Sequence, residues 1–294
     1  MVRSSQADLL SALNAWLQTE RSVCAVVLFG SQVRPPGTPA ASDGWSDVDL
    51  HVITTAAARI EQTNWSKVLP NQHFCLQVLR PATGGVRKLT VLFDEGEADL
   101  VILPATRLRL VDVAMTLGFH RKIGSLRYAL NSLSTIMGGG YRFLKGEGKW
   151  GPFYAKVIAE MPGYRINDRE IINLADIFLC DLLWVLQKLQ RGELVAAQRI
   201  LHRSLMETNV LFLHEARIRQ GQPTFQQARR VEQLVSSSEL SAVQLSARLD
   251  REELHLAAWQ VFAGFKILMA ELQPAWTVPA SMNELLSRYS VPRE

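Results

Sequence analysis

Long hydrophobic runs are absent from this sequence. The longest apolar stretch, residues 23–30, has the length of a β-strand, whereas a membrane-spanning helix needs about 20 apolar residues. The N-terminal residues 1–8 are polar and lack the apolar core of a secretion signal. We therefore expect a cytoplasmic protein without a membrane partner.

Cysteine is scarce as well. The three cysteines, Cys24, Cys75 and Cys180, are far apart and form no Cys-x-x-Cys pair. An odd number without such a pair argues against a disulfide framework and against a zinc site. Because each cysteine lies within an apolar run, we expect buried, reduced thiols.

Glycine and proline are modest in number, 18 and 12 of 294 residues, and there is no repeat or low-complexity tract. With 48% apolar residues, the composition excludes disordered and fibrous classes and indicates a globular protein. A chain of this length favours two domains of about 100–200 residues each. Alternating strands and helices give way to long helices near residue 155, so we predict domains over residues 1–155 and 156–294.

Positive charge is concentrated in the middle of the chain. Residues 1–104 contain 8 basic and 10 acidic residues, residues 105–166 contain 10 and 3, and residues 167–294 contain 14 and 15. The middle segment therefore has a net charge of +7. Two interpretations stay open: this segment faces a polyphosphate or nucleic-acid backbone, or it is a solvated helix face.

Strand and helix patterns alternate in the first half. The patterns predict strands over residues 23–29, 47–53, 73–79, 86–93, 98–103 and 141–144, and a helix over residues 106–118. The turn at residues 94–97 joins two of these strands as a hairpin. The second half consists of helical patterns, one of which starts with a capping box at Asn167. The predicted fold class is α/β, with an N-terminal mixed sheet followed by a C-terminal all-helical bundle.

Residues suited to phosphate chemistry follow the first two strands. Gly30 and Ser31 end the strand 23–29, where glycine lets a phosphate approach the backbone and serine offers N–H and hydroxyl donors. Asp47 and Asp49 are two residues apart on the next strand and therefore point to the same side. Carboxylates and phosphates together suit Mg²⁺. Asp99, on a later strand, completes a trio that can hold two ions for an in-line phosphoryl displacement.

This order of residues resembles the active site of the nucleotidyltransferase superfamily typified by DNA polymerase β. In that superfamily Gly-Ser is followed by Asp-x-Asp or Asp-x-Glu and by a third carboxylate. Residues 92–100 also resemble the third-carboxylate hairpin of the streptomycin 6-adenylyltransferase branch, which modifies aminoglycosides. The resemblance covers about the first 150 residues. The helical second half is consistent with that branch only by size and class.

The resemblance implies a role for each of the five residues. Gly30 and Ser31 would bind the triphosphate, and Asp47 and Asp49 would bind the metal ions. Asp99 would complete the metal site and could accept the proton of the acceptor hydroxyl.

Two features depart from the family pattern. Gln32 stands where many members have Arg or Thr, and the proline-rich loop before the first aspartate, residues 34–39, makes the spacing longer than usual. The first departure affects one phosphate contact, and the second affects the mouth of the site.

Four further residues are weaker candidates. Lys145 and Lys149, near a glycine-rich turn, are assigned to the triphosphate, although a solvated turn explains them equally well. His51 lies on the same strand face as the aspartates and is assigned to the acceptor, with a hydrogen-bonded structural histidine as the alternative. Asp176 lies on a mostly apolar helix and is assigned to a cationic acceptor, with a salt bridge to a neighbouring helix as the alternative.

These residues predict an enzyme, a Mg²⁺-dependent nucleotidyltransferase that uses two metal ions. It would move a nucleoside monophosphate, AMP from ATP in the simplest case, to a hydroxyl of a small molecule and release pyrophosphate. The resemblance implies an aminoglycoside antibiotic as acceptor, bound by the helical domain, and hence a role in antibiotic resistance. Two alternatives stay open: a transferase acting on tRNA or protein, which the basic middle segment favours, and a non-catalytic nucleotide-binding module.

Overall fold

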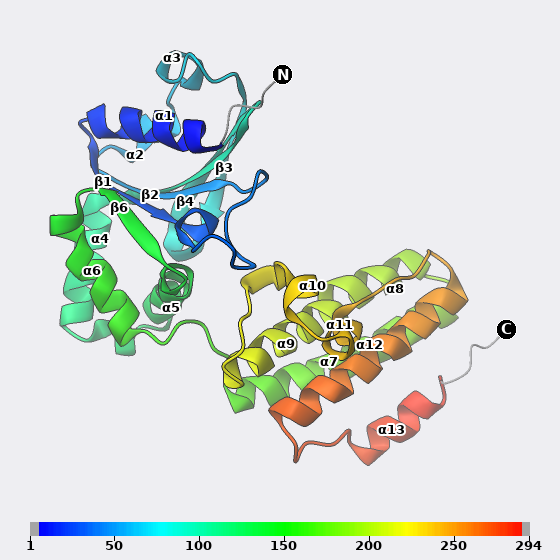
Figure 1. Cartoon of the computed structure of the whole chain (residues 1–294). Helices are drawn as coiled ribbons and strands as arrows, with labels where there is room; N and C mark the ends of the chain where they lie inside the picture. The colour runs from blue at the N-terminus through cyan, green and yellow to red at the C-terminus, as the bar shows by residue number, and fades with distance from the viewer. Residues whose placement is uncertain (1–5, 290–294) are drawn as a thin grey trace. The chain divides into compact units, whose positions relative to one another are not determined.

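The chain divides into two compact units, unit 1 (residues 1–164) and unit 2 (residues 165–294), in a computed structural model that describes residues 6–289 (Figure 1). Residues 1–5, which carry part of the expectation about secretion, lie outside the described range. The division follows Tyr164 and not residue 155, because helix α6 (Glu147–Glu160) buries Trp150, Phe153 and Tyr154 in the core of unit 1. Within the described range, no helix has the length and apolar character needed to cross a membrane.

Unit 1 is built on a six-stranded mixed sheet. The strands are β1 (Val23–Phe29), β2 (Val48–Thr54), β3 (Phe74–Ala82), β4 (Val86–Phe93), β5 (Gly96–Pro104) and β6 (Tyr141–Lys145). They lie in the order β3-β4-β5-β2-β1-β6, with β2 and β5 parallel and every other neighbouring pair antiparallel. The predicted mixed sheet is therefore confirmed, and β4 and β5 form the predicted hairpin.

Helices cover both faces of this sheet (Figure 1). The helices on one face are α1 (Gln6–Thr19), α2 (Ala57–Glu61) and α3 (Trp65–Val68), and those on the other are α4 (Ala105–Thr116), α5 (Gly124–Gly138) and α6. Successive strand residues point to opposite faces, so Val48 and Leu50 of β2 join the core under α1, whereas Ile53 joins the core under α4–α6. Asp49 alternates with Val48 and Leu50 and therefore points to the side of α4–α6.

Unit 2 is all helical in the range that the structure describes, as predicted. Its helices are α7 (Asp168–Gln190), α8 (Leu194–Ile200), α9 (Glu207–Arg219), α10 (Val231–Leu234), α11 (Ser237–Val243), α12 (Arg251–Leu272) and α13 (Ala280–Ser287). The predicted capping box starts α7: the Glu170 N–H donates to the Asn167 side chain at 3.0 Å, and the Asn167 N–H donates to the Glu170 carboxylate at 3.0 Å. The core of unit 2 includes the stacked rings of Phe178 and Phe265, whose centroids lie 3.9 Å apart.

The cysteines depart from the expectation of buried thiols. Cys75 and Cys180 are exposed and Cys24 is half-buried. Cys75 lies near the start of the edge strand β3, and Cys180 lies on the exposed face of α7. The expectation was wrong because an apolar run in the sequence does not reveal which of its residues turn outward.

Candidate active site

Three carboxylates meet where β2 and β5 lie side by side. Asp47 directly precedes β2 and Asp49 lies on it, so their alternation points both to the same face. Asp99 lies on β5, opposite Asp49 in the parallel register. The three residues offer carboxylate oxygens that all lie within 4.8 Å of one another. The structure therefore brings together the three aspartates selected from the sequence.

The Gly30–Ser31 turn adjoins these carboxylates. Residues 30–33 form a 3₁₀ turn directly after β1, whose last residue, Phe29, is opposite Asp49. Gly30 has a φ of +77°, and a Cβ at this position would lie only 2.3 Å from Oδ2 of Asp49, so glycine is required here. Ser31 is 3% exposed, and its hydroxyl has no hydrogen-bond partner among the residues that the structure describes. Burying a hydroxyl without a partner is unfavourable, and a phosphate oxygen would satisfy it.

This donor set fits a divalent cation held together with a phosphate. Mg²⁺ prefers oxygen ligands at about 2.1 Å, which places two oxygens on one ion about 3–4 Å apart. The carboxylate oxygens, all within 4.8 Å of one another, reach that spacing by small side-chain rotations. Asp47, Asp49 and Asp99 are therefore the residues that could hold metal, and Ser31 is the donor that could hold phosphate.

Strand β4 contributes two residues that the sequence analysis did not select. Thr90 lies opposite Asp99, and its hydroxyl donates a hydrogen bond to Oδ1 of Asp99 at 2.5 Å. Lys88, two residues away on the same face, forms an ion pair with Oδ2 of Asp99. Asp99 is only 3% exposed, so these contacts compensate for the burial of its charge. The hairpin turn comprises residues 94–95 and not the predicted residues 94–97; counting outward from the shorter turn pairs Thr90 with Asp99, and this is the signal that could have found Thr90.

A fourth carboxylate, that of Glu97, lies two residues before Asp99 on the same face of β5. Burial raises the pKa of Glu97, and the carboxylates of Asp99 and Asp47 raise this pKa further, whereas Lys88 and Arg80 act in the opposite direction. Glu97 was predicted to lie in the turn, but it lies on strand β5, opposite Leu92. The site therefore gathers four carboxylates against two nearby cations.

His51 belongs to the core and not to an open site. It is 4% exposed, and its Nδ1 lies 2.9 Å from the Tyr154 hydroxyl of α6. The assignment to the acceptor is therefore corrected to the structural alternative. The physical reason is that α6 covers β2 at this position, whereas it leaves Asp49, two residues earlier, partly exposed.

Lys145, one of the two lysines assigned to the triphosphate, lies toward the other end of the sheet from Gly30. Because β6 runs antiparallel to β1, Tyr141 is opposite Phe29 at the end that carries Gly30, and Lys145 is opposite Val26. Three strand residues separate the two pairs by about 10 Å. This position corrects the assignment of Lys145, whereas the assignment of Lys149, on α6, stays a prediction.

The two lysines lie in different environments. The ammonium of Lys145 donates to the backbone carbonyls of Leu17, Gln18 and Glu20 at 2.9, 3.1 and 3.3 Å, at the C-terminal end of α1. Lys149 is exposed on α6, with its Nζ 5.8 Å from the centroid of the Trp150 ring. Lys145 therefore caps a helix, and Lys149 is a surface residue.

Asp176 lies on the exposed face of α7 in unit 2, together with the exposed side chain of Ile177. Neighbouring positions Ala175 and Phe178 are buried in the core of unit 2. The assignment of Asp176 to an acceptor stays a prediction.

A second cluster of potential metal ligands lies at the start of β3 and the turn before β5. Nδ1 of His73 and Sγ of Cys75 lie 3.1 and 3.0 Å from the carboxylate of Asp94, and all three residues are exposed. The hydrogen bond to Asp94 raises the pKa of the Cys75 thiol. A metal ion would have to displace the thiol proton and break this hydrogen bond. We therefore interpret these three residues as a hydrogen-bonded cluster on the surface.

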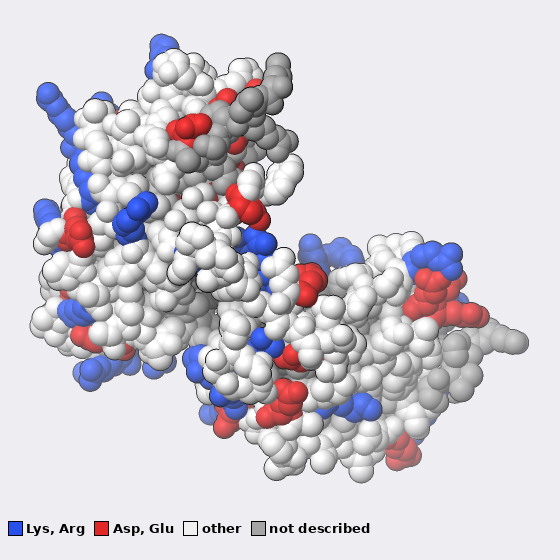
Figure 2. Space-filling model, in the orientation of Figure 1, with Lys and Arg blue, Asp and Glu red and all other residues white. Residues whose placement is uncertain are grey.

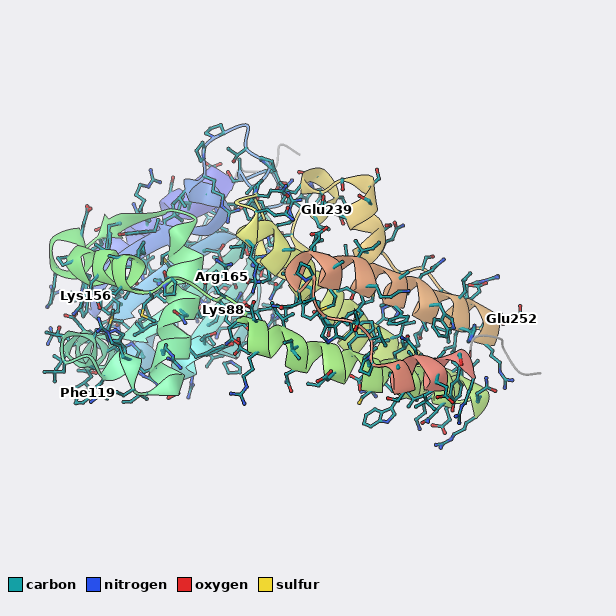
Figure 3. All side chains as sticks on the ribbon, turned by 90° about the horizontal axis from the view of Figure 1, so that it is seen from below. Lys88, Phe119, Lys156, Arg165, Glu239 and Glu252 are labelled. Carbon is teal, nitrogen blue, oxygen red and sulfur yellow. The ribbon has the colours of Figure 1, made fainter. Side chains whose placement is uncertain are left out.

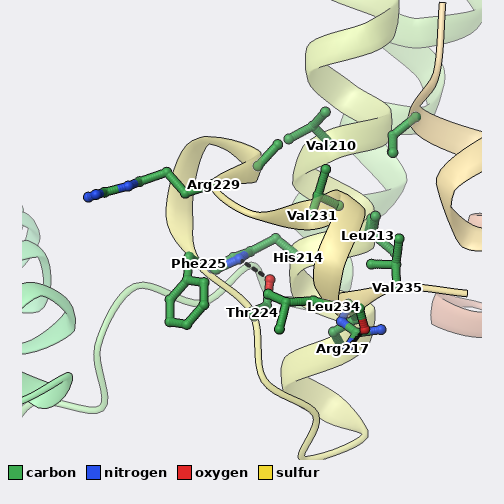
Figure 4. A pocket seen from close by; sticks show the side chains of 12 residues that line it. Val210, Leu213, His214, Arg217, Thr224, Phe225, Arg229, Val231, Leu234 and Val235 are labelled. Atoms are coloured by element: carbon green, nitrogen blue, oxygen red, sulfur yellow. Dashed lines mark hydrogen bonds between the residues drawn. The ribbon is translucent and has the colours of Figure 1, made fainter. Parts of the chain in front are cut away.

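A small hollow in unit 2 lies beside α9 (Figure 4). It is lined mainly by apolar side chains, and three of its polar side chains have partners within the chain. His214 Nδ1 lies 3.0 Å from the Thr224 hydroxyl. The Arg217 guanidinium donates to the Glu239 carboxylate and to the carbonyls of Leu234 and Pro223. These contacts hold residues 223–239 against α9. We therefore interpret the hollow as a gap left where this segment packs on the helix.

Comparison with known proteins finds likeness only at the level of structure. No family model and no curated protein sequence matches this chain. A crystal structure of an aminoglycoside 6-adenyltransferase from Bacillus subtilis aligns with 98% of this chain and 97% of its own, at 12% identity and a TM-score of 0.40. A nucleotidyltransferase-like protein from Exiguobacterium sibiricum aligns with 93% of this chain and 78% of its own, at 10% identity and a TM-score of 0.31. At these scores the chemistry of this chain has to be judged from its own side chains.

Proposed function

We propose that this chain is a Mg²⁺-dependent nucleotidyltransferase that moves AMP from ATP to a hydroxyl of a small molecule. The observation that supports this function best is the meeting of Asp47, Asp49 and Asp99 beside the turn formed by Gly30 and Ser31. A buried hydroxyl without a partner and a glycine in contact with a carboxylate suit a bound metal–phosphate group.

In the proposed reaction, the acceptor hydroxyl oxygen attacks the α-phosphorus of the nucleotide. The bond from that phosphorus to the β-phosphate oxygen breaks, and pyrophosphate leaves with the electron pair. The hydroxyl proton passes to a carboxylate of the site: to Asp99, or to Glu97 where the ion pair with Lys88 occupies Asp99. Ser31 and the backbone at Gly30 hold the triphosphate, and Asp47 and Asp49 bind Mg²⁺. The ion, when bound, neutralises the charge that develops on the phosphate oxygens.

The charge of the site favours a cationic acceptor. Four carboxylates face two nearby cations, Lys88 and Arg80, and one bound Mg²⁺ would balance the remaining negative charge. The bound triphosphate then adds about four negative charges, so an acceptor bearing ammonium groups gains electrostatic attraction that a neutral or anionic acceptor lacks. We therefore propose an aminoglycoside-type acceptor, with antibiotic modification as the role. The helical unit 2 is proposed to bind the acceptor, with Asp176 as one contact.

Transfer of label from α-³²P nucleoside triphosphates tests this function. Each of the four triphosphates is incubated with Mg²⁺ and either a panel of aminoglycosides and lincosamides or bulk tRNA. The wild type is compared with Asp47→Asn/Asp49→Asn. We expect label from ATP in an aminoglycoside, and a loss of at least about a hundredfold in the variant, because it lacks the two carboxylates that bind the metal.

The other outcomes separate the alternatives. Label in tRNA that depends on the same carboxylates would replace the small acceptor by nucleic acid. Nucleotide binding without transfer to any acceptor would support a non-catalytic module. Equal transfer by wild type and variant would contradict the proposed site, provided that the circular dichroism of the variant shows an intact fold.

A further inference from the structure

The surroundings of Asp99 differ from those expected of a carboxylate whose oxygens are available to bind a metal ion. Its side chain is buried, and both of its oxygens already have partners within unit 1. Oδ1 accepts the hydrogen bond of the Thr90 hydroxyl, and Oδ2 forms the ion pair with the Lys88 ammonium. Asp47 and Asp49, in contrast, are only half-buried.

The strand register explains why Lys88 reaches Asp99. Thr90 is directly opposite Asp99 on the neighbouring antiparallel strand, and Lys88 is opposite Val101. Residues two apart on a strand share a face, so the Lys88 side chain leaves β4 on the face that carries the carboxylates. Its side chain is 35% exposed and therefore passes from the strand toward the more open part of that face. The position of Lys88 on β4 therefore places its ammonium beside the three aspartates.

A second divalent ion on Asp99 would have to compete with this ammonium. A buried ion pair stays together because separating it leaves both charges without compensation. An ammonium and a divalent cation on one carboxylate also repel each other. The arrangement therefore disfavours the two-ion site that the sequence analysis expected.

We propose that Lys88 is a resident cation that takes the place of the second metal ion. On this view, which rests on the proposed function, the site binds one divalent ion through Asp47 and Asp49. The Lys88 ammonium neutralises Asp99 and supplies the second positive charge near the reacting phosphate. Thr90 positions Asp99 for this pair.

Binding of Mn²⁺ alone to the full chain, measured by the electron paramagnetic resonance signal of unbound Mn²⁺, tests the proposal. The wild type is compared with Lys88→Met, Asp99→Asn and the double variant Lys88→Met/Asp99→Asn. We expect one Mn²⁺ per chain in the wild type, and a dissociation constant that Asp99→Asn changes by no more than about threefold. We expect Lys88→Met to gain a second ion and the double variant to lose it again, because only an unpaired Asp99 can join the metal site.

Two further variants guard against loss of fold and non-specific charge effects. Lys88→Arg keeps the positive charge, and we expect it to retain one ion. Lys156→Met removes a lysine that pairs with Asp112 at 3.4 Å and lies well away from Lys88 within unit 1 (Figure 3), so the ion count should not change. Circular dichroism confirms the fold of each variant.

The proposal is overturned if the wild type binds two ions and Asp99→Asn removes one of them, or if Lys88→Met still binds only one. Two ions that both disappear in Asp47→Asn/Asp49→Asn would leave the proposed function in place and remove only the role of Lys88. A wild type that binds no Mn²⁺ would remove both.

Discussion

His51 illustrates how one buried side chain links the strand that carries Asp49 to the helix that covers it. Its ring packs against Phe29 with centroids 4.6 Å apart, and its Nδ1 is bonded to the Tyr154 hydroxyl of α6. Burial lowers the pKa of His51 to about 3. The imidazole therefore stays neutral at the pH where the enzyme is expected to work, and it holds β2 in place without taking part in proton transfer.

This pKa makes the stability of unit 1 depend on pH. In the unfolded chain His51 has a pKa of about 6.5 and binds a proton as the pH falls, whereas in the folded chain it stays neutral down to about pH 3. Its contribution is complete above about pH 6.5 and is lost progressively between pH 6.5 and 3. We expect this residue to lower the free energy of unfolding by about 1.4 kcal/mol between pH 7.5 and 5.5.

Urea unfolding of the wild type and of His51→Gln at these two pH values measures the effect. The wild type should lose about 1.4 kcal/mol more than the variant over this interval. Equal losses would show that His51 titrates similarly in the folded and unfolded chains.

The unpartnered hydroxyl of Ser31 gives a second prediction at this scale. If it binds a phosphate oxygen, Ser31→Ala should raise the dissociation constant of α,β-methylene-ATP about tenfold or more, because a hydrogen bond to a charged group contributes about 1.5–3 kcal/mol. Stability should stay the same or rise, because the variant removes a buried polar atom that has no partner in the described structure. Calorimetric titration and thermal unfolding measure the two effects.

Ser134→Ala is a matched control, since Ser134 is also buried but donates to the Met161 carbonyl at 2.7 Å. Its loss should lower stability by about 1 kcal/mol and leave nucleotide affinity unchanged. The phosphate role of Ser31 would be refuted by the opposite pattern, in which Ser31→Ala destabilises the fold and binds nucleotide normally.

At the scale of elements, alternation was enough to predict that Asp47 and Asp49 share a face. Asp99 was selected because it lies on a later strand and completes the order of residues found in the family that the sequence resembles. What the sequence could not show was the order of the strands. The antiparallel pairing of β6 with β1 carries Lys145 away from Gly30, and this pairing depends on contacts between residues more than a hundred positions apart.

The sequence also did not show which helix covers which part of each strand. His51 follows the same alternation as Asp49, yet α6 covers only the former. The part of each strand that a helix covers depends on the path of the chain through residues 105–160. Lys88 was missed for another reason: a lone lysine on a strand has no distinguishing pattern in the sequence until its neighbour across the sheet is known.

The position of Lys145 at the end of α1 gives a prediction for this element. Three backbone carbonyls accept hydrogen bonds from its ammonium, and a cation at this end also interacts favourably with the helix dipole. Lys145→Met should therefore lower the free energy of unfolding by about 1–2 kcal/mol. The KM for ATP should change by less than about twofold, because Lys145 lies about 10 Å along the sheet from the end that carries Gly30.

Lys149→Met provides the comparison, since Lys149 is exposed on α6 and its loss should change stability by less than about 0.5 kcal/mol. Denaturant unfolding and steady-state kinetics of both variants measure the effects. A tenfold rise in KM with unchanged stability in Lys145→Met would restore the triphosphate role.

At the scale of the whole molecule, the charge is divided unequally between the units. Residues 1–164 contain 17 basic and 13 acidic residues, a net charge of +4, whereas residues 165–294 contain 15 of each. On the face shown in Figure 2, the lysine and arginine side chains of unit 1 are scattered and form no continuous belt.

Several basic residues of the middle segment also have partners within their own unit. Arg107 donates to the carbonyls of Gly84 and Gly85, and Lys156 pairs with Asp112. Together with Lys145 at the end of α1, these are three of the ten basic residues of the segment, whereas six others are exposed: Arg109, Arg121, Lys122, Arg127, Arg142 and Lys149. A surface that tracks a nucleic-acid backbone needs several cations aligned along it, so the arrangement of these six residues decides between the two acceptor classes.

The salt dependence of acceptor binding therefore separates the two acceptor classes. Nucleic acid releases counterions from several phosphates, so its affinity falls by about a thousandfold or more between 50 and 200 mM salt. For a small cationic acceptor beside partly buried carboxylates, salt only screens the electrostatic attraction between the two. We therefore expect the KM of such an acceptor to rise by no more than about tenfold over this range. Steady-state transfer assays in KCl measure the slope, with the KM for ATP as an internal reference. A steep slope for the acceptor alone would mean that the basic middle segment binds a polyanion, and that the carboxylates of unit 1 do not select the substrate by charge.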